Sequence, residues 1–290
     1  MQQRQELAAI LSCSKTSAVG WFSQYELQLI EAIYNQINAD EPSLAQSLLL
    51  QGLSLMPYAW QSRLFDSKGA LGSDNLIAKR HMLVRYTVAT AIQQQFTQIV
   101  FLGGSCDPYS FTVALDNDIK VFEVVDKEIL EPKLRVLMQH AETTIHLDGS
   151  YQLGSNAHFF PLAENQDWFE MLLGQGFKTF EKTLFVIERF SDPQLLTRIA
   201  ECACVDNQVF IGVQASKEED EELTDVFGIQ SMVNTYGFNL AAKRMDLGKP
   251  HYFLLQLKNA GHAPDNIPDI PLTLLSVPEE KLAESTCVLF

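Results

Sequence analysis

The stretch that most constrains the fold runs from Gln98 to Asp126, where two short apolar segments flank a glycine-containing turn. Gln98–Leu102 (QIVFL) ends at Gly103–Gly104 and has the composition of a buried parallel strand. Asp118–Val125 predicts a second strand. This layout is typical of the first βαβ unit of a nucleotide-binding sheet, in which glycines let the backbone approach a cofactor and an acid about 20 residues further on binds ribose hydroxyls.

The glycine pattern leaves an alternative open. The turn GGSCDP lacks the first and last glycines of a complete dinucleotide fingerprint. Similar turns occur at plain crossovers that bind no cofactor. Glu123 lies at the expected distance from Gly103, so the acid supports a nucleotide site better than the glycines do.

Composition and charge argue against several classes of protein. The chain has 290 residues, 47% hydrophobic and 20% charged, as in a folded globular protein. Its formal net charge of −15 at pH 7 argues against nucleic acid as a partner and against binding to anionic membranes through charge alone. The N-terminal residues lack the apolar core of a secretory signal, and no run approaches the roughly 18 apolar residues that span a bilayer. We therefore expect a cytoplasmic protein.

The five cysteines are scattered along the chain, a pattern typical of a reducing compartment. Cys202 and Cys204 form the one close pair, and no histidine or second cysteine pair follows them at zinc-ligand spacing. We therefore expect no metal site.

The first 96 residues have a helical pattern. Ser23–Asn38 places apolar residues at helical spacing behind a capping box of Ser23 and Glu26. Two further helices are expected at Pro42–Leu53 and His81–Phe96. A Gly/Ser-rich loop is expected between them, at Ser67–Asp74. Such a helical preface either forms a lid over a cofactor pocket or covers one sheet face, and the sequence leaves both open.

After the first βαβ unit, apolar runs alternate with helical segments. Five further strands are expected at His158–Leu162, Thr183–Glu188, Gln208–Val213, Phe238–Met245 and His251–Leu257. We predict an α/β fold with a Rossmann-like, doubly wound, mostly parallel seven-stranded sheet that ends in an antiparallel hairpin, preceded by an N-terminal helical cap. The expected parts are a helical cap or lid at 1–96, a core at 97–258 and a proline-containing tail at 259–290 that lies outside the core.

Four short motifs follow one another in the middle of the chain. They are VFLGGSCDPY at Val100–Tyr109, FEVVDKEILEPK at Phe122–Lys133, Trp168 with Gly176–Phe177, and TLFVIER at Thr183–Arg189. In this order they resemble the motifs of the leucine carboxyl methyltransferase family, whose members use S-adenosylmethionine (SAM). The resemblance implies that the core binds SAM and that the protein transfers a methyl group to a carboxylate, of a small molecule or a protein C-terminus, by direct in-line displacement.

The resemblance also implies which residues bind the methionine part of SAM. Arg85 would pair with the carboxylate of SAM, with Arg80 as a competitor, because a guanidinium matches a carboxylate bidentately. Gly103 and Gly104 would let the backbone pass close to the cofactor. Glu188 would face the amino group of SAM.

For the nucleoside part, the resemblance implies Glu123 or Asp126 at the ribose and Leu162 near the adenine. Val125 stands where the family has its ribose-binding aspartate, and Pro161 stands where it has an acid near the adenine. An ionised carboxylate substrate needs alignment more than a general base, so no catalytic residue is nominated. The departures leave an alternative open, a catalytically degenerate member that acts as a binding or membrane-recruited interaction module.

The last four residues, Cys287–Phe290 (CVLF), match a prenylation signal whose final phenylalanine favours geranylgeranyl. Cys287 would then carry a lipid and give weak, reversible membrane affinity in a eukaryotic cytosol, which a secreted effector also reaches. The alternative is an apolar C-terminus that packs on the fold.

Overall fold

The computed structural model describes residues 3, 6–8, 10–11, 22–40, 70–162, 167–190, 194–201, 207–213, 226–244, 251–257 and 269–270. The expected helix at Pro42–Leu53, the Cys202–Cys204 pair and the C-terminal Cys287 lie outside these residues.

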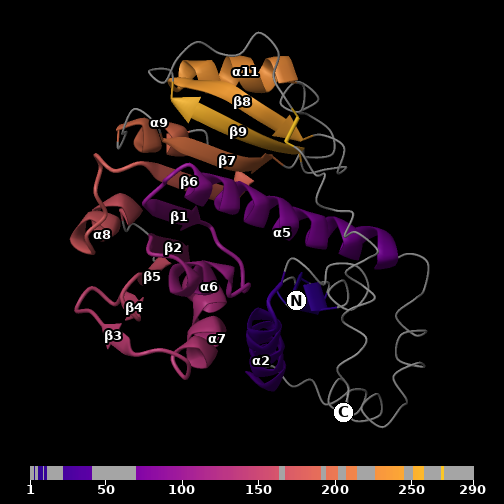
Figure 1. Ribbon diagram of the computed structural model, residues 1–290, viewed down its shortest axis with the longest axis vertical. Helices are drawn as coiled ribbons and strands as arrows, with labels where there is room; N and C mark the ends of the chain where they lie inside the picture. Colours follow the sequence, from indigo (N-terminus) through magenta and orange to yellow (C-terminus); the bar gives the residue numbers. More distant parts are fainter. Residues whose placement is uncertain are drawn as a thin grey trace.

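One sheet of nine strands forms the centre of the molecule (Figure 1). The strands are β1 (Gln98–Leu102), β2 (Lys120–Asp126), β3 (Thr143–Ile145), β4 (Tyr151–Leu153), β5 (Ala157–Leu162), β6 (Thr183–Phe190), β7 (Gln208–Val213), β8 (Phe238–Arg244) and β9 (His251–Leu257). Their order across the sheet is β3-β4-β5-β2-β1-β6-β7-β9-β8. β5, β2, β1, β6 and β7 are mutually parallel, and β9 runs antiparallel between β7 and β8. The predicted mostly parallel α/β sheet is confirmed.

The predicted number of seven strands is wrong, because the short antiparallel hairpin β3–β4 extends the sheet beside β5. Each of its two strands has three residues. β3 has no buried residue and β4 has one. Three residues are also too few for an apolar alternation to indicate a strand.

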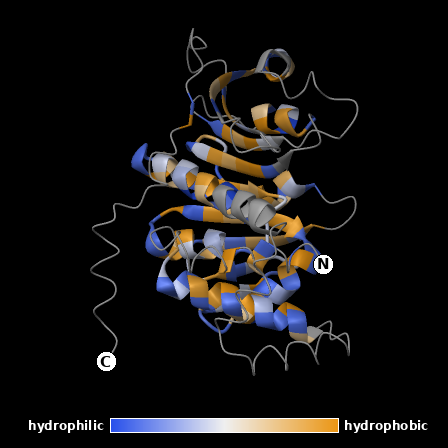
Figure 2. Ribbon diagram, turned by 90° about the vertical axis from the view of Figure 1, so that its right-hand side faces the viewer, coloured by the Kyte–Doolittle hydropathy of each residue, from blue (hydrophilic) through white to orange (hydrophobic). Residues whose placement is uncertain are grey.

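Alternate side chains of the central strands face two separate cores. Ile99 and Phe101 of β1 pack on the side of α2, α5, α6 and α7, whereas Val100 and Leu102 pack on the side of α8, α9 and α11. The helices are α2 (Gln24–Asp40), α5 (Ala70–Gln93), α6 (Tyr109–Asp116), α7 (Lys127–Leu137), α8 (Trp168–Gly174), α9 (Gln194–Glu201) and α11 (Val226–Thr235). Hydrophobic residues line the strands (Figure 2). Covering both faces with helices gives the doubly wound arrangement.

Helix α5 crosses one face of the sheet (Figure 1). It carries Arg80 and Arg85, the first of the predicted site residues along the chain. It begins at Ala70, so the loop expected at Ser67–Asp74 is wrong from residue 70 onward. Gly72 costs a helix about 1 kcal/mol relative to alanine. Burial of Leu83, Val84 and Val88 against the sheet offsets that cost.

Two smaller observations concern the ends of the chain. The Glu26 N–H donates to Ser23 Oγ at 3.1 Å, as the capping box predicts for the start of α2. Asp269 forms a bridge with Lys243 of β8, and Ile270 beside it is buried in the core. Ile270, in the expected tail at 259–290, therefore packs in the core on the side of α5. None of the described helices is both long enough and apolar enough to span a membrane.

Candidate functional site

The turn after β1 lies at the carboxyl edge of the sheet, where open α/β sheets bind ligands. Gly103 has a φ of +71°, a left-handed conformation that other residues disfavour, and its N–H donates to the Val124 carbonyl at 2.9 Å. A Cβ on Gly104 would collide with Oε1 of Glu123. Gly103 therefore suits the backbone conformation of the turn, and Gly104 leaves the space that the Glu123 carboxylate occupies.

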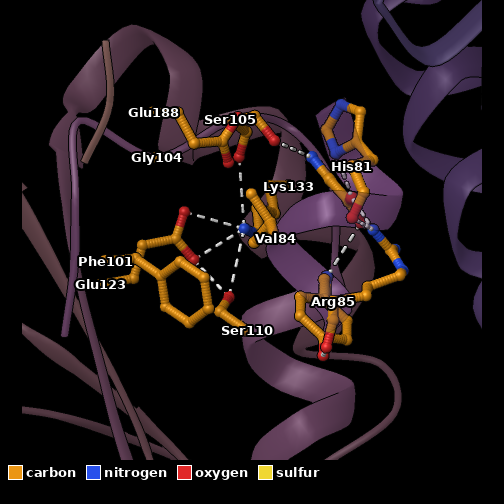
Figure 3. A pocket seen from close by; sticks show the side chains of 12 residues that line it. His81, Val84, Arg85, Phe101, Gly104, Ser105, Ser110, Glu123, Lys133 and Glu188 are labelled. Atoms are coloured by element: carbon orange, nitrogen blue, oxygen red, sulfur yellow. Dashed lines mark hydrogen bonds and ion pairs between the residues drawn. The ribbon is translucent and has the colours of Figure 1, made fainter. Parts of the chain in front are cut away.

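Glu123 and Lys133 form a buried ion pair beneath this turn (Figure 3). Lys133 Nζ donates to the two carboxylate oxygens at 2.7 and 2.9 Å and lies 3.3 Å from the Ser105 carbonyl. Ser110 Oγ also donates to Glu123. Burial raises the pKa of Glu123, and the charge of Lys133 opposes that rise. Because protein groups hold both oxygens, the structure gives Glu123 a structural role and not a position open to a ribose.

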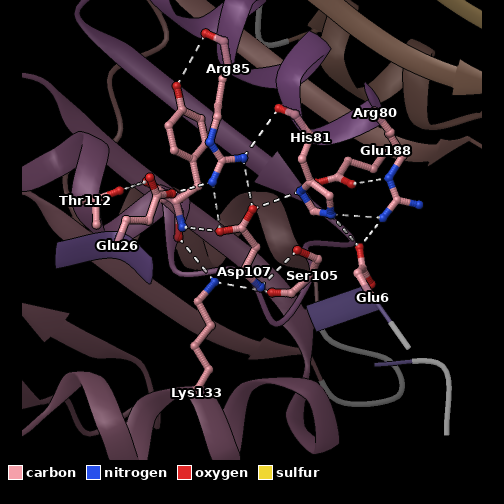
Figure 4. Close-up of polar contacts among 12 residues, drawn as sticks. Glu6, Glu26, Arg80, His81, Arg85, Ser105, Asp107, Thr112, Lys133 and Glu188 are labelled. Atoms are coloured by element: carbon pink, nitrogen blue, oxygen red, sulfur yellow. Dashed lines mark hydrogen bonds and ion pairs between the residues drawn. The ribbon is translucent and has the colours of Figure 1, made fainter. Parts of the chain in front are cut away.

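Asp107 is the centre of a second buried network (Figure 4). Its two oxygens accept from Arg85 Nη1 and Nη2 at 3.1 and 3.2 Å, and His81 Nδ1 lies 2.9 Å from Oδ2. Arg85 also bonds the Glu26 carboxylate, and its guanidinium lies 4.2 Å from the centre of the Tyr109 ring. Arg85 therefore ties α2, α5 and the β1 turn together, with both of its Nη atoms bonded to protein groups.

The charges of this network depend on one another. Burial alone would raise the pKa of Asp107, but Arg85 and His81 hold it far below its usual range. Burial would lower the pKa of His81, yet its hydrogen bonds to Asp107 and Glu6 raise it to about 9. Burial raises the pKa of Glu26 to about 7 in spite of Arg85, and the charge of Asp107 adds to that rise. His81 is therefore a cation at neutral pH.

Arg80 is the arginine that lies beside Glu188. Its Nε lies 3.2 Å from Glu188 Oε2, and its Nη2 contacts Glu6 Oε1. His81 Nε2 lies 3.0 Å from the same Glu6 oxygen. The Arg80 side chain is 13% exposed and that of Arg85 is 4% exposed. The structure thus brings the competing arginine, and not Arg85, to the expected acid at the end of β6.

The same cluster has the outline of a metal site. Glu6, His81 and Glu188 each offer one possible ligand atom, and these atoms lie within 4.8 Å of one another. The Arg80 guanidinium, however, contacts both carboxylates, and the imidazole of His81 is protonated. A divalent cation would have to displace two positive charges, so we assign no metal here.

The cavity among these side chains is small (Figure 3). It lies between Gly104, Glu123, Lys133 and Glu188 and has a volume of about 10 Å³, roughly the space of one water molecule. Ligand pockets have roughly 300–1,000 Å³. In this arrangement, side chains fill the place where an open α/β sheet binds its ligand.

The part of the chain that contains the glycine turn, the Glu123–Lys133 pair and Asp107 matches a known family. The model of the family described as leucine carboxyl methyltransferase matches residues 46–191, half of the 290-residue chain. The chain belongs to the leucine carboxyl methyltransferase family. The match includes α5, the glycine turn and the strands from β1 to β6. None of the curated proteins compared with it matches the sequence.

Several solved structures are similar to this chain. A candidate O-methyltransferase from Nostoc punctiforme PCC 73102 is 13% identical with a TM-score of 0.41, and the match covers 64% of this chain and 59% of that one. A ribosomal protein L11 methylase from Lactobacillus delbrueckii subsp. bulgaricus is 10% identical with a TM-score of 0.41 and coverage of 61% and 79%. A SAM-dependent methyltransferase from Aquifex aeolicus is 11% identical with a TM-score of 0.36 and coverage of 56% and 81%.

Membership of the leucine carboxyl methyltransferase family implies use of SAM, and the residue types at this sheet edge fit that cofactor in part. Arg80 offers a guanidinium to a carboxylate, and Glu188 offers a carboxylate to an ammonium group. Asp126 is exposed at the end of β2 and is the register partner of Leu162 at the end of β5. The cavity of about 10 Å³ means that side chains must move before a nucleoside enters.

Sequence reasoning did not identify Asp107, His81 or Glu6 as site residues. One signal was present, because His81 and Arg85 lie four residues apart on one face of a helix, and buried cations require nearby acids. Glu6 offered no such signal, since 74 residues separate it from Arg80.

Proposed function

We propose that the protein is a SAM-dependent O-methyltransferase that acts on a carboxylate. The observation that carries the proposal is the Arg80–Glu188 pair at the carboxyl end of β6, within the region that matches the family. An arginine and a glutamate side by side complement the carboxylate and the ammonium of an amino acid, and SAM carries both groups. Small acids and protein C-termini both remain candidate substrates.

Bound SAM would supply an electrophilic methyl group on a positively charged sulfonium. The residues of this chain would bind and align. Arg80 and Glu188 would hold the amino-acid end, Gly103–Gly104 would let the backbone lie close, and the adjacent ends Asp126 and Leu162 would lie at the ribose and adenine. A carboxylate substrate is ionised at neutral pH, so the site needs to orient it and exclude water rather than remove a proton.

One observation favours a second candidate function. Arg85 and Glu123 are neutralised by other protein groups, and the remaining cavity holds about 10 Å³. These features would suit a degenerate member that binds a partner without transferring a methyl group. A lipid on Cys287 would recruit such a module to a membrane.

Isothermal titration of the full chain with SAM and with S-adenosylhomocysteine (SAH) separates the two functions. We expect binding of both ligands, weakened about tenfold to a hundredfold in Arg80→Met, because a hydrogen bond to a charged group contributes roughly 1.5–3 kcal/mol. The control is Arg198→Met, which removes an arginine paired with Asp167 and Glu201 on the surface. If the folded wild type binds neither ligand, the enzyme proposal fails and the degenerate module becomes the better account.

A further inference from the structure

The N-terminal segment delivers a carboxylate into the site. Glu6 is 4% exposed, and Leu7 and Ile10 beside it are fully buried in the core on the side of α5. This apolar anchoring fixes the position of the Glu6 carboxylate. Figure 4 shows it facing Arg80 and His81 from a segment far away in the sequence.

Glu6 occupies the groups that a ligand carboxylate would need. Arg80 contacts Glu6 through Nη2 while its Nε faces Glu188, and His81 Nε2 lies 3.0 Å from the same Glu6 oxygen. A guanidinium, a protonated imidazole and a neighbouring acid are the partners expected for the carboxylate and ammonium of an amino acid. The protein therefore satisfies this anion-binding position with one of its own side chains.

The cavity leaves no second position for such a ligand. It has a volume of about 10 Å³, and its walls include the Glu123–Lys133 pair, which is held on several sides. Glu6 differs from these walls, because it belongs to the N-terminal segment and not to a strand or to the turn after β1. Its withdrawal would free Arg80 Nη2 and His81 Nε2 together.

We propose that Glu6 is an internal carboxylate that closes the cofactor site, and that ligand binding requires the N-terminal segment to release Arg80 and His81. The inference rests on the proposed SAM-binding function. A site that is open for only a fraction of the time binds its ligand more weakly by that fraction. Removing the charge of Glu6 therefore tightens ligand binding. Substituting a residue that binds the cofactor would instead weaken it.

The test measures SAH affinity by isothermal titration in the full-length wild type, Glu6→Gln and Glu6→Asp, because SAH allows no turnover. We expect both variants to bind SAH about tenfold or more tightly than the wild type, since glutamine loses the charge and aspartate is too short to reach Arg80. Glu31→Gln is the matched control, because it removes one acid from an exposed position on α2, and we expect wild-type affinity. Thermal unfolding shows whether each variant is folded.

A second measurement needs no variant. Amide hydrogen exchange of the wild type reports on residues 6–11, and the proposal predicts faster exchange there when SAH is saturating. Equal affinity in the wild type and Glu6→Gln, weaker binding in Glu6→Gln, or unchanged exchange would overturn the internal closure and leave the proposed function standing. If no variant binds SAH, both proposals fail.

Discussion

The Glu123–Lys133 pair offers a sharp test of how this site is held together. Lys133→Met removes the cation and leaves a buried carboxylate with Ser110 as its remaining side-chain partner. Breaking a buried ion pair from one side costs about 3–5 kcal/mol. We expect that loss of unfolding free energy for Lys133→Met and a similar loss for Glu123→Leu.

The double variant Glu123→Leu/Lys133→Met decides whether the pair itself is responsible. Replacing both partners with apolar side chains of similar size removes the unpaired charge, so we expect a total loss of only about 0–2 kcal/mol. The cycle then gives a coupling energy of several kcal/mol. Urea unfolding, monitored by circular dichroism, gives the free energy of unfolding of the wild type, the two single variants and the double variant.

Helix α7, which carries Lys133, also supplies a matched control pair. Lys127 and Glu131 form an exposed ion pair at 3.5 Å on α7, and we expect a coupling of about 0.5 kcal/mol or less for it. A coupling for Glu123 and Lys133 as small as that of the control would refute the reasoning, because the buried pair would then not stabilise the turn.

A pH series adds an independent check on Lys133→Met. Without the lysine, the pKa of buried Glu123 lies further above its unfolded value of about 4.3. When the pKa of an acid is higher in the folded state than in the unfolded state, the protein loses stability as the pH rises above the unfolded-state pKa. We therefore expect the deficit of Lys133→Met relative to the wild type to be smaller at pH 5 than at pH 8, and the opposite trend would contradict this account.

Two further predictions concern the neighbouring residues. The folded-state pKa of His81 is raised from the ordinary value of about 6.5 to about 9. Its stabilising contribution of roughly 3 kcal/mol is complete below pH 6.5 and is lost as the pH rises to about 9. The wild type should therefore lose more stability than His81→Gln between pH 6.5 and 9 in urea unfolding. Gly103→Ala should cost about 1–2 kcal/mol from the left-handed backbone at φ +71°, and an unchanged midpoint in thermal unfolding would show that the turn relaxes.

The strands that the sequence predicted share one property, a run of buried apolar residues. β1, for example, is buried at every position. A strand that is buried on both faces has a continuous apolar run, which can be recognised in the sequence without knowledge of what packs against it. The β3–β4 hairpin lacks it, since its three-residue strands pair at the sheet edge through their backbones. The sequence does not predict the start of α5 for a related reason. Gly72 favours a loop in the local sequence, whereas packing further along the helix decides the conformation of this segment.

The position of the site was predictable because glycine turns and strand-end acids lie at one edge of a parallel sheet. The partners were not. Arg85 reaches Glu26 across 59 residues and Asp107 across 22, and no sequence period links such positions. A choice between Arg80 and Arg85 depends on which face of α5 meets the β1 turn, and that is set by packing.

Charge balance explains why Glu6 is exchangeable for a ligand. Among the described residues, the two networks and their neighbours contain the acids Glu6, Glu26, Asp107, Glu123 and Glu188 against the cations Arg80, His81, Arg85 and Lys133. Removing Glu6 without replacement leaves Arg80 Nη2 and His81 Nε2 without the carboxylate that they contact, which is costly in a buried site. A ligand that brings its own carboxylate to Arg80 while Glu6 leaves keeps the negative charge constant, and its ammonium adds a cation beside Glu188. An analogue that lacks the carboxylate would leave Arg80 Nη2 without an acid, so we expect adenosine alone to leave Glu6 in place.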